Sequence, residues 1–220
     1  MTANDSVALD ELELDALTEL VNLGVSRAAL GLREMVREEV LLSVPKVSIV
    51  TREEAVANFG DADARRLVAV HQDFEGEIKG RALLIFPETK SMELVRAVVG
   101  GELPLEELME LEQEALAETG NVILNSCLGT IANNLERSLR ISLPEVVYGD
   151  GAKFFAMGPA PDVNDRVMFI FINFIVRQRN ITGYVAMLLD LPSLVTLKSM
   201  LKRYIERTGG EALPTHSHVI

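Results

Sequence analysis

The segment LDALTELVNLGVSRAA (Leu14–Ala29) carries a polar spacing that returns in a later segment, LAETGNVILNSCLGTIANNL (Leu116–Leu135). An acidic residue is followed by Glu four positions on, by Asn three positions later, and by Pro after 22 intervening residues. The first copy comprises Asp15, Glu19, Asn22 and Pro45, and the second comprises Glu114, Glu118, Asn121 and Pro144. Each member of the second copy lies 99 positions after its counterpart. The sequence therefore predicts an internal duplication.

Each copy places three polar residues at helix positions i, i+4 and i+7, which share one face of a helix. These sets are termed stripe one (Asp15, Glu19 and Asn22) and stripe two (Glu114, Glu118 and Asn121). Two interpretations are open. The stripes are functional surfaces, or they are the acidic polar faces of ordinary amphipathic helices, which a duplication also preserves. The repeat in register favours function.

Length and composition describe an ordinary globular protein. The 220 residues suffice for one large domain or two small halves with a real core. The hydrophobic fraction is 48% and the charged fraction 25%. The net charge is −12, and no Lys/Arg cluster is long enough to grip a phosphate backbone, so nucleic acid is not an expected partner.

Nothing in the sequence predicts secretion or membrane insertion. The acidic start, MTANDSVALDELELD, has no apolar region typical of a signal peptide. The longest apolar run, Val167–Val176, is too short to span a bilayer as a helix and predicts a buried strand. Cys127 is the single cysteine and is expected to be a buried small residue. We expect a soluble cytoplasmic protein.

Apolar periodicity gives the same order of elements twice. In the first half, Gly24 either allows close helix packing or breaks a helix in two. The elements predicted there are helix over 7–39, a strand after Pro45, a short helix at 52–59, a hairpin of 66–74 and 78–86, and a helix at 88–99. Those predicted in the second half are helices at 105–120 and 121–139, a strand at 145–148, a loop at 151–165, a hairpin of 166–177 and 181–189 turning at Arg179–Asn180, and a last helix from Pro192 to about 207.

These elements predict one α/β domain over residues 1–208, built from two repeats at about 7–100 and 105–208. Its strands are expected to join into one mostly antiparallel sheet flanked by helices, because neither half alone buries its apolar surface. A pseudo-two-fold axis would place the two stripes on one side. Residues 209–220 are expected to form a flexible tail.

The usual catalytic motifs are missing from the sequence. It contains no G-x-S-x-G, no Walker A run and no G-x-G-x-x-G, and its one Cys has no His nearby in sequence. His71 falls in a predicted strand, where a structural or surface role is expected. His216 and His218 form an H-x-H pair without a third metal ligand, so we expect solvated tail residues and no bound metal.

The stripes combine a carboxylate with a carboxamide one helical turn away. A carboxamide both donates and accepts hydrogen bonds, so it can hold a water in line for attack without removing a proton. A carboxylate can pair with a lysine of a partner and fix how that partner docks. This chemistry needs a substrate that is already reactive, such as an acyl phosphate with its own metal ion.

The duplicated spacing resembles that of the CheC/CheX/FliY family of chemotaxis phosphatases, over nearly the whole chain. Two copies and the length favour the CheC type. The resemblance implies a pseudo-symmetric α/β/α layered fold and removal of the phosphoryl group from the aspartyl phosphate of the response regulator CheY. By the same resemblance, Glu19 and Glu118 bridge a lysine of CheY, while Asn22 and Asn121 orient the hydrolytic water. The Mg²⁺ belongs to CheY, so this chain needs no cofactor of its own.

An alternative class of function is a non-catalytic binding module. The switch protein FliM has the same type of domain without the Glu/Asn pairs and uses it for assembly, whereas both pairs are present here. A second alternative is an adaptor that binds the receptor deamidase CheD, as CheC-type proteins do. The sequence does not choose between phosphatase and adaptor work.

Overall fold

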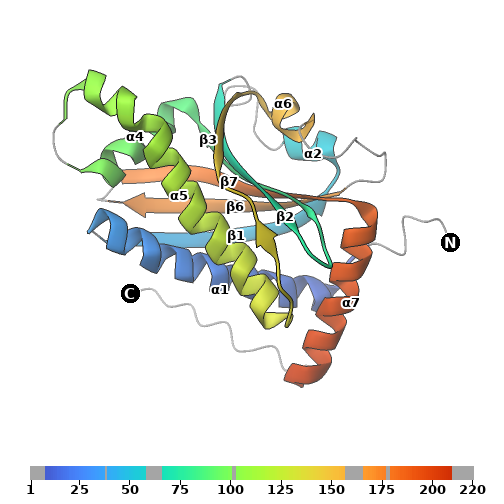
Figure 1. The fold of residues 1–220 in the computed structure, drawn as a ribbon. Coiled ribbons are helices and arrows are strands. Elements are labelled where there is room, and N and C mark those ends of the chain that lie inside the picture. Colours follow the sequence, from blue (N-terminus) through green and yellow to red (C-terminus); the bar gives the residue numbers. More distant parts are fainter. Residues whose placement is uncertain are drawn as a thin grey trace.

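The computed structural model describes residues 8–37, 39–57, 66–100, 103–156, 166–176 and 179–209. One antiparallel sheet lies between two layers of helices (Figure 1). Its strands are β1 (Val40–Val50), β2 (Leu67–Glu75), β3 (Gly80–Pro87), β4 (Arg140–Ile141), β5 (Glu145–Gly149), β6 (Arg166–Val176) and β7 (Arg179–Leu189). The predicted α/β/α class is confirmed.

The sheet interleaves the two halves of the chain. Its strand order is β1-β6-β7-β3-β2-β4, and β5 also pairs with β2. The outer strand of each half therefore pairs with a hairpin of the other half: β1 with β6, and β5 with β2. The hairpins meet at the centre, where Leu84 of β3 pairs with Val185 of β7. This arrangement is the predicted pseudo-two-fold.

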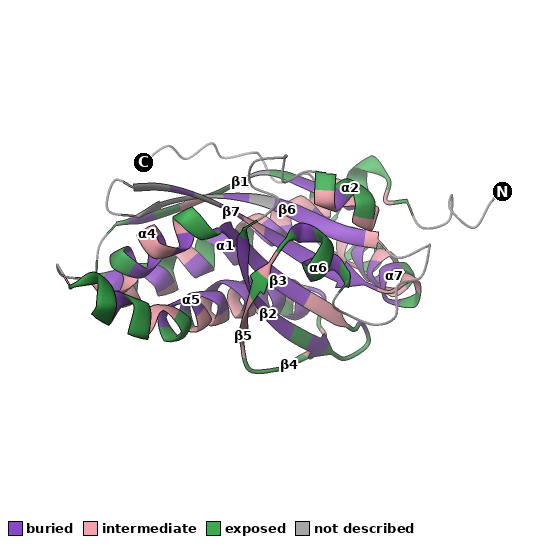
Figure 2. Cartoon of the chain, turned by 90° about the horizontal axis from the view of Figure 1, so that it is seen from above, coloured by how far each residue is buried: buried purple, intermediate pink, exposed green. Residues whose placement is uncertain are grey.

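Four helices cover one face of the sheet. They are α1 (Glu11–Val36), α4 (Glu88–Val99), α5 (Leu105–Asn134) and α7 (Leu191–Thr208). Their apolar sides join inward residues of the strands, such as Val70 and Leu84, in the larger core cluster. The opposite face carries the short helices α2 (Arg52–Ala57) and α6 (Gly151–Ala156), where Phe154 and Phe155 pack on a smaller cluster. Figure 2 shows buried strands between the two helical layers.

The N-terminus of α1 is fixed by local hydrogen bonds. Asp10 is the N-cap, its Oδ1 accepts the N–H of Glu13 at 2.9 Å, and its own N–H donates to Oε2 of Glu13 at 2.8 Å. Glu13 is only 1% exposed, and Lys198 and Lys202 of α7 lie 3.5 and 3.7 Å from its carboxylate. This capping box therefore also joins α1 to α7.

Several predicted boundaries are wrong. The helices predicted at 105–120 and 121–139 form one continuous helix, α5, which ends at Asn134. The helix predicted over 7–39 is α1, and of the two alternatives for Gly24 the structure shows close packing. Residues 151–156 form α6 where a loop was expected, since Phe154 and Phe155 bury against the sheet. Arg179 and Asn180, predicted as the turn of the second hairpin, belong to β7, and residues 177–178 lie outside the described residues. β1 begins at Val40 and runs through Pro45, which an edge strand tolerates at a register shift.

Other predictions stay untested or hold closely. The short helix α2 and the hairpins β2–β3 and β6–β7 lie within a few residues of the predicted ranges. The domain limits and the predicted tail remain predictions, because residues 210–220, including His216 and His218, lie outside the described residues. Among the described helices, none combines the length and the apolar character that crossing a membrane requires.

Candidate functional site

Stripe one lies on the outer side of α1. Asp15 is exposed, and Glu19 and Asn22 are half-buried. The opposite side of the helix packs into the core through residues such as Leu17 and Leu20. The Asn22 side chain has no hydrogen-bond partner among the residues that the structure describes.

Stripe two occupies the corresponding part of α5. Glu114 and Glu118 are exposed, and Asn121 is half-buried. Asn121 differs from Asn22 because its side chain is hydrogen-bonded. Its Oδ1 accepts from Nδ2 of Asn125 at 2.7 Å and from Nε2 of Gln72 at 3.3 Å. The sequence analysis missed both partners; Asn125 carried a usable signal, because it lies one helical turn after Asn121.

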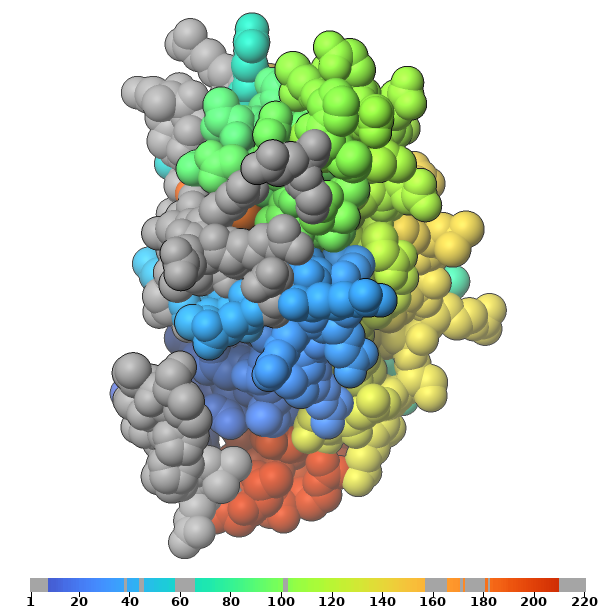
Figure 3. Space-filling view, turned by 90° about the vertical axis from the view of Figure 1, so that its left-hand side faces the viewer, coloured from blue at the N-terminus to red at the C-terminus, as the bar shows by residue number. Residues whose placement is uncertain are grey.

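The two helices that carry the stripes pack against each other. A Cβ placed on Gly24 of α1 would lie 2.8 Å from Cα of Cys127 on α5, so the helices touch through backbone at this point. Nη1 of Arg27 donates to Oγ1 of Thr130 at 3.2 Å across the same contact. Figure 3 shows α1 (blue) side by side with α5 (green to yellow) and α7 (red) at the lower end. Both stripes therefore belong to one helical layer.

The two prolines of the motif lie in the strands and segments next to the helices. Pro45 stands within the register shift of β1, and Pro144 immediately precedes β5. The segment before Pro144 adjoins stripe two, because Nε2 of Gln72 donates to the carbonyl of Ser142 at 2.8 Å and also reaches Asn121. Leu143, between Ser142 and Pro144, is 84% exposed and offers an apolar contact beside the stripe.

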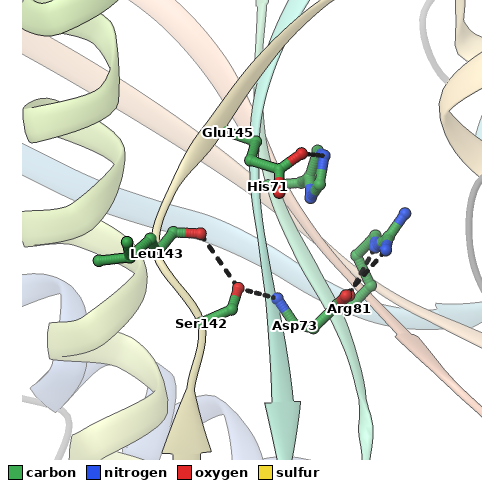
Figure 4. Close-up of polar contacts among 6 residues, drawn as sticks. All are labelled: His71, Asp73, Arg81, Ser142, Leu143 and Glu145. Atoms are coloured by element: carbon green, nitrogen blue, oxygen red, sulfur yellow. Dashed lines mark hydrogen bonds and ion pairs between the residues drawn. The ribbon is translucent and has the colours of Figure 1, made fainter.

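A polar cluster lies on β2, β3 and the segment around β5 (Figure 4). Arg81 donates from Nε and Nη2 to the carboxylate of Asp73 at 2.6 and 2.9 Å, and this bond lowers the pKa of Asp73. His71 is buried, with Nε2 3.5 Å from Glu145, and burial together with the charge of Arg81 lowers its pKa. Figure 4 shows Leu143 pointing away from these groups. The cluster ties strands together, as expected for a structural His71.

The described residues provide neither a cluster of metal ligands nor a reactive cysteine nucleophile. Among them, no group of three or more His, Cys, Asp or Glu side chains lies close enough to hold a metal ion. Cys127 is fully buried under α1, and burial raises its pKa to about 12, so it is no thiolate nucleophile. The open surface of the stripes, with exposed carboxylates and an Asn one turn away, instead suits docking of a partner that brings its own reactive group.

Sequence comparisons place the chain near two curated proteins. It is 27% identical over 141 residues to the CheY-P phosphatase CheC of Bacillus subtilis, covering 63% of this chain and 67% of the relative. It is 24% identical over 147 residues to the putative CheY-P phosphatase CheC1 of Halobacterium salinarum, covering 66% and 74%. No protein-family model matches the chain.

Structural comparison supports the same fold. The crystal structure of FliY from Thermotoga maritima superposes with a TM-score of 0.72 at 17% identity, covering 90% of this chain and 99% of that one. At this identity the match speaks for the fold alone.

Proposed function

We propose that the chain, which is similar to CheC and FliY proteins, is a member of the CheC/CheX/FliY family of chemotaxis phosphatases and hydrolyses the aspartyl phosphate of a CheY-type response regulator. The observation that carries the proposal is the pairing of Glu and Asn, one turn apart, on the outer side of two packed helices. The curated relatives bear the name of this activity.

In the proposed reaction the chain contributes orientation and charge, and no covalent intermediate. Glu19 or Glu118 pairs with a lysine of the docked receiver and fixes its register. Asn22 or Asn121 holds a water in line with the phosphorus atom. The water oxygen forms the new P–O bond while the P–O bond to the aspartyl oxygen breaks, so a free carboxylate leaves and the water proton ends on phosphate or solvent.

In the proposed reaction the receiver, and not this chain, binds the Mg²⁺ ion. Mg²⁺ bound by the receiver would neutralise charge on the phosphoryl oxygens. The stripes themselves are a poor site for it, because the described residues contain no cluster of three ligating side chains. The chain would thus need no cofactor, and its partner is a phosphorylated receiver met in the cytoplasm.

The direct test is phosphate release from a panel of phosphorylated CheY-type receivers with Mg²⁺. The wild-type chain should accelerate release, and Asn22→Ala combined with Asn121→Ala should abolish nearly all of the acceleration. Asn133→Ala is a matched control, because Asn133 is an exposed Asn on α5 away from the stripe. A double variant with wild-type turnover would contradict the proposal. Receiver binding without any turnover would instead indicate a binding module or an adaptor, with CheD among the partners to test.

A further inference from the structure

The carbonyl oxygen of Asn121 is fully engaged inside the protein. It accepts two hydrogen bonds, one from Nδ2 of Asn125 at 2.7 Å and one from Nε2 of Gln72 at 3.3 Å. A carboxamide oxygen has two lone pairs, so its accepting capacity is used. Nδ2 of Asn121 has no partner among the described residues. Asn121 therefore presents only hydrogen-bond donors to its surroundings.

A backbone carbonyl fixes this orientation. Gln72 is 1% exposed, and its amide group lies 2.8 Å from the carbonyl oxygen of Ser142. A backbone carbonyl only accepts hydrogen bonds, so the nitrogen end of Gln72 must face it. The second hydrogen of that nitrogen lies between two acceptors, Oδ1 of Asn121 at 3.3 Å and Oδ1 of Asn125 at 3.4 Å. Nδ2 of Asn125 donates to Oδ1 of Asn121 at 2.7 Å, so both neighbouring amides direct a donor at this oxygen. The carbonyl of Ser142 thus orients Gln72, and Gln72 and Asn125 together orient Asn121.

Close packing of α5 on β2 makes these contacts reachable. A Cβ on Gly120 would lie 2.4 Å from Cγ1 of Val70, a distance that real Cβ atoms do not adopt. Gly120 immediately precedes Asn121, and Val70 lies two residues before Gln72 on β2. The missing side chain at position 120 thus lets the helix approach the strand where the two amides meet.

The strand register identifies the equivalent positions at stripe one. Val47 of β1 and Val146 of β5 are 99 positions apart, as are the members of the stripes. Val47 pairs with Ile170 of β6, and Val146 pairs with Val70 of β2. Ile170 and Val70 are therefore equivalent, and the counterpart of Gln72 is Ile172.

Stripe one lacks the whole arrangement. Its residues at the three equivalent positions are Ile172 for Gln72, Ser26 for Asn125, and Val21 for Gly120. Ile172 is buried and has no side-chain donor, and Ser26 is exposed with no side-chain hydrogen bond among the described residues. Among the described residues, none fixes the amide of Asn22 by a hydrogen bond, whereas two fix that of Asn121.

We infer that Gln72 and Asn125 are positioning residues that hold Asn121 with its amide N–H outward, so that site two turns over faster than site one. The inference rests on the proposed function. An N–H of Asn121 donates to one lone pair of the attacking water and leaves the other lone pair directed at phosphorus. At site one no described residue fixes the amide of Asn22 in this orientation, so we expect a smaller fraction of productive encounters there.

The test isolates site two in an Asn22→Ala background and replaces Asn125. Asn125→Ser installs the residue that site one has, and should lower kcat about tenfold with KM unchanged, as expected for one lost orienting hydrogen bond. Asn125→Asp keeps the shape but only accepts hydrogen bonds, so it should turn the amide of Asn121 inward and lower kcat further. Thermal unfolding of each variant checks that the helix is intact.

Matched controls use site one, isolated by Asn121→Ala. Ser26→Ala should leave kcat unchanged there, and Ser26→Asp measures the effect of an added charge at the equivalent position. The inference is overturned if Asn125→Ser retains the kcat of its parent, or if Asn125→Asp loses no more than Ser26→Asp does.

A second measurement does not depend on activity. Side-chain ¹⁵N relaxation of the wild-type chain should give a higher order parameter for the amide of Asn121 than for that of Asn22, and Asn125→Ser should remove the difference. Equal order parameters in the wild-type chain would contradict the positioning role. If no receiver is dephosphorylated at all, the proposed function fails, while this measurement still decides whether Asn121 is held.

Discussion

Gly24 of α1 lies so close to Cys127 of α5 that a Cβ on Gly24 would approach the Cα of Cys127 to 2.8 Å. The obstructing atoms are backbone, which cannot turn aside as a flexible side chain can. The contact fixes the separation of the two helices that carry stripe one and stripe two. Residue type at this one position therefore controls both the stability of the helical layer and the placement of the stripes.

Gly24→Ala should destabilise the protein by about 1–3 kcal/mol, because the added methyl group forces the helices apart. Gly129→Ala is the matched control within α5, since a Cβ there meets nothing within 4 Å, and it should stabilise by about 0.5–1 kcal/mol through helix propensity. Urea unfolding measures both. Equal stabilities for the two variants would show that the helices separate without penalty.

Replacing Glu19 and Glu118 together with Gln should weaken binding to a phospho-receiver mimic by about 1–3 kcal/mol, because a charged hydrogen-bonding partner is lost while shape is kept. Calorimetric titration at two salt concentrations measures the affinity and its salt dependence. The charge-matched control is Glu34→Gln with Glu106→Gln, two exposed carboxylates elsewhere on the same helices. If both double variants bind equally, the effect is one of overall charge and not of docking.

Glu13→Ala should lower the free energy of unfolding by about 2–3 kcal/mol. It removes the capping box of α1 and leaves Lys198, whose side chain is 19% exposed, without its carboxylate. Glu11→Ala, an exposed first-turn substitution in the same helix, should change stability by less than about 0.5 kcal/mol. Chemical denaturation of the two variants compares them, and a Glu13→Ala protein as stable as Glu11→Ala would disprove the link to α7.

Stability should fall as the pH drops through the ordinary pKa of histidine, 6.5, because burial lowers the pKa of His71 in the folded state. Between the folded and the unfolded pKa the unfolded chain binds the extra proton, so the loss occurs on acidification and not on raising the pH. His71→Leu should reduce the slope of unfolding free energy against pH between about 7.5 and 5. An identical slope in both proteins would mean that His71 titrates normally.

The sequence predicted the layered fold and the stripe-bearing helices because both depend on local periodicity. Asp15, Glu19 and Asn22 share a face whatever the tertiary structure, and α1 holds them as expected. The choice between a break and close packing at Gly24 stayed open, since a mid-helix glycine allows either until its neighbour, here Cys127, is known. The predicted division of α5 between residues 120 and 121 was wrong. Residues 151–156 were misjudged because the two Phe that bury α6 find their partners only in the assembled sheet.

The role of Gln72 was out of reach for a different reason. Gln72 lies in a strand, 49 positions from Asn121 in the sequence. Its contact with Asn121 depends on the strand register that places Gln72 opposite the segment before Pro144. The spacing of the motif is identical in the two halves, and its residue types differ only at Asp15 and Glu114, so it predicts similar sites. The inferred difference between the sites comes from residues that the motif does not include, Gln72 on β2 and Asn125 on α5.

The two halves exchange their outer strands: β1 pairs with β6, and β5 pairs with β2. The chain therefore resembles a domain-swapped dimer whose two subunits are joined by a linker. Fragments divided after Gly100 should be insoluble or unfolded when expressed singly, since each would expose an unpaired strand edge, and should regain the fold when co-expressed. Gel filtration and circular dichroism of the two preparations would decide it. The same arrangement limits how the protein can evolve. Because neither half folds without the other, one of the two sites can lose its activity only by substitution of its residues, not by deletion of its half.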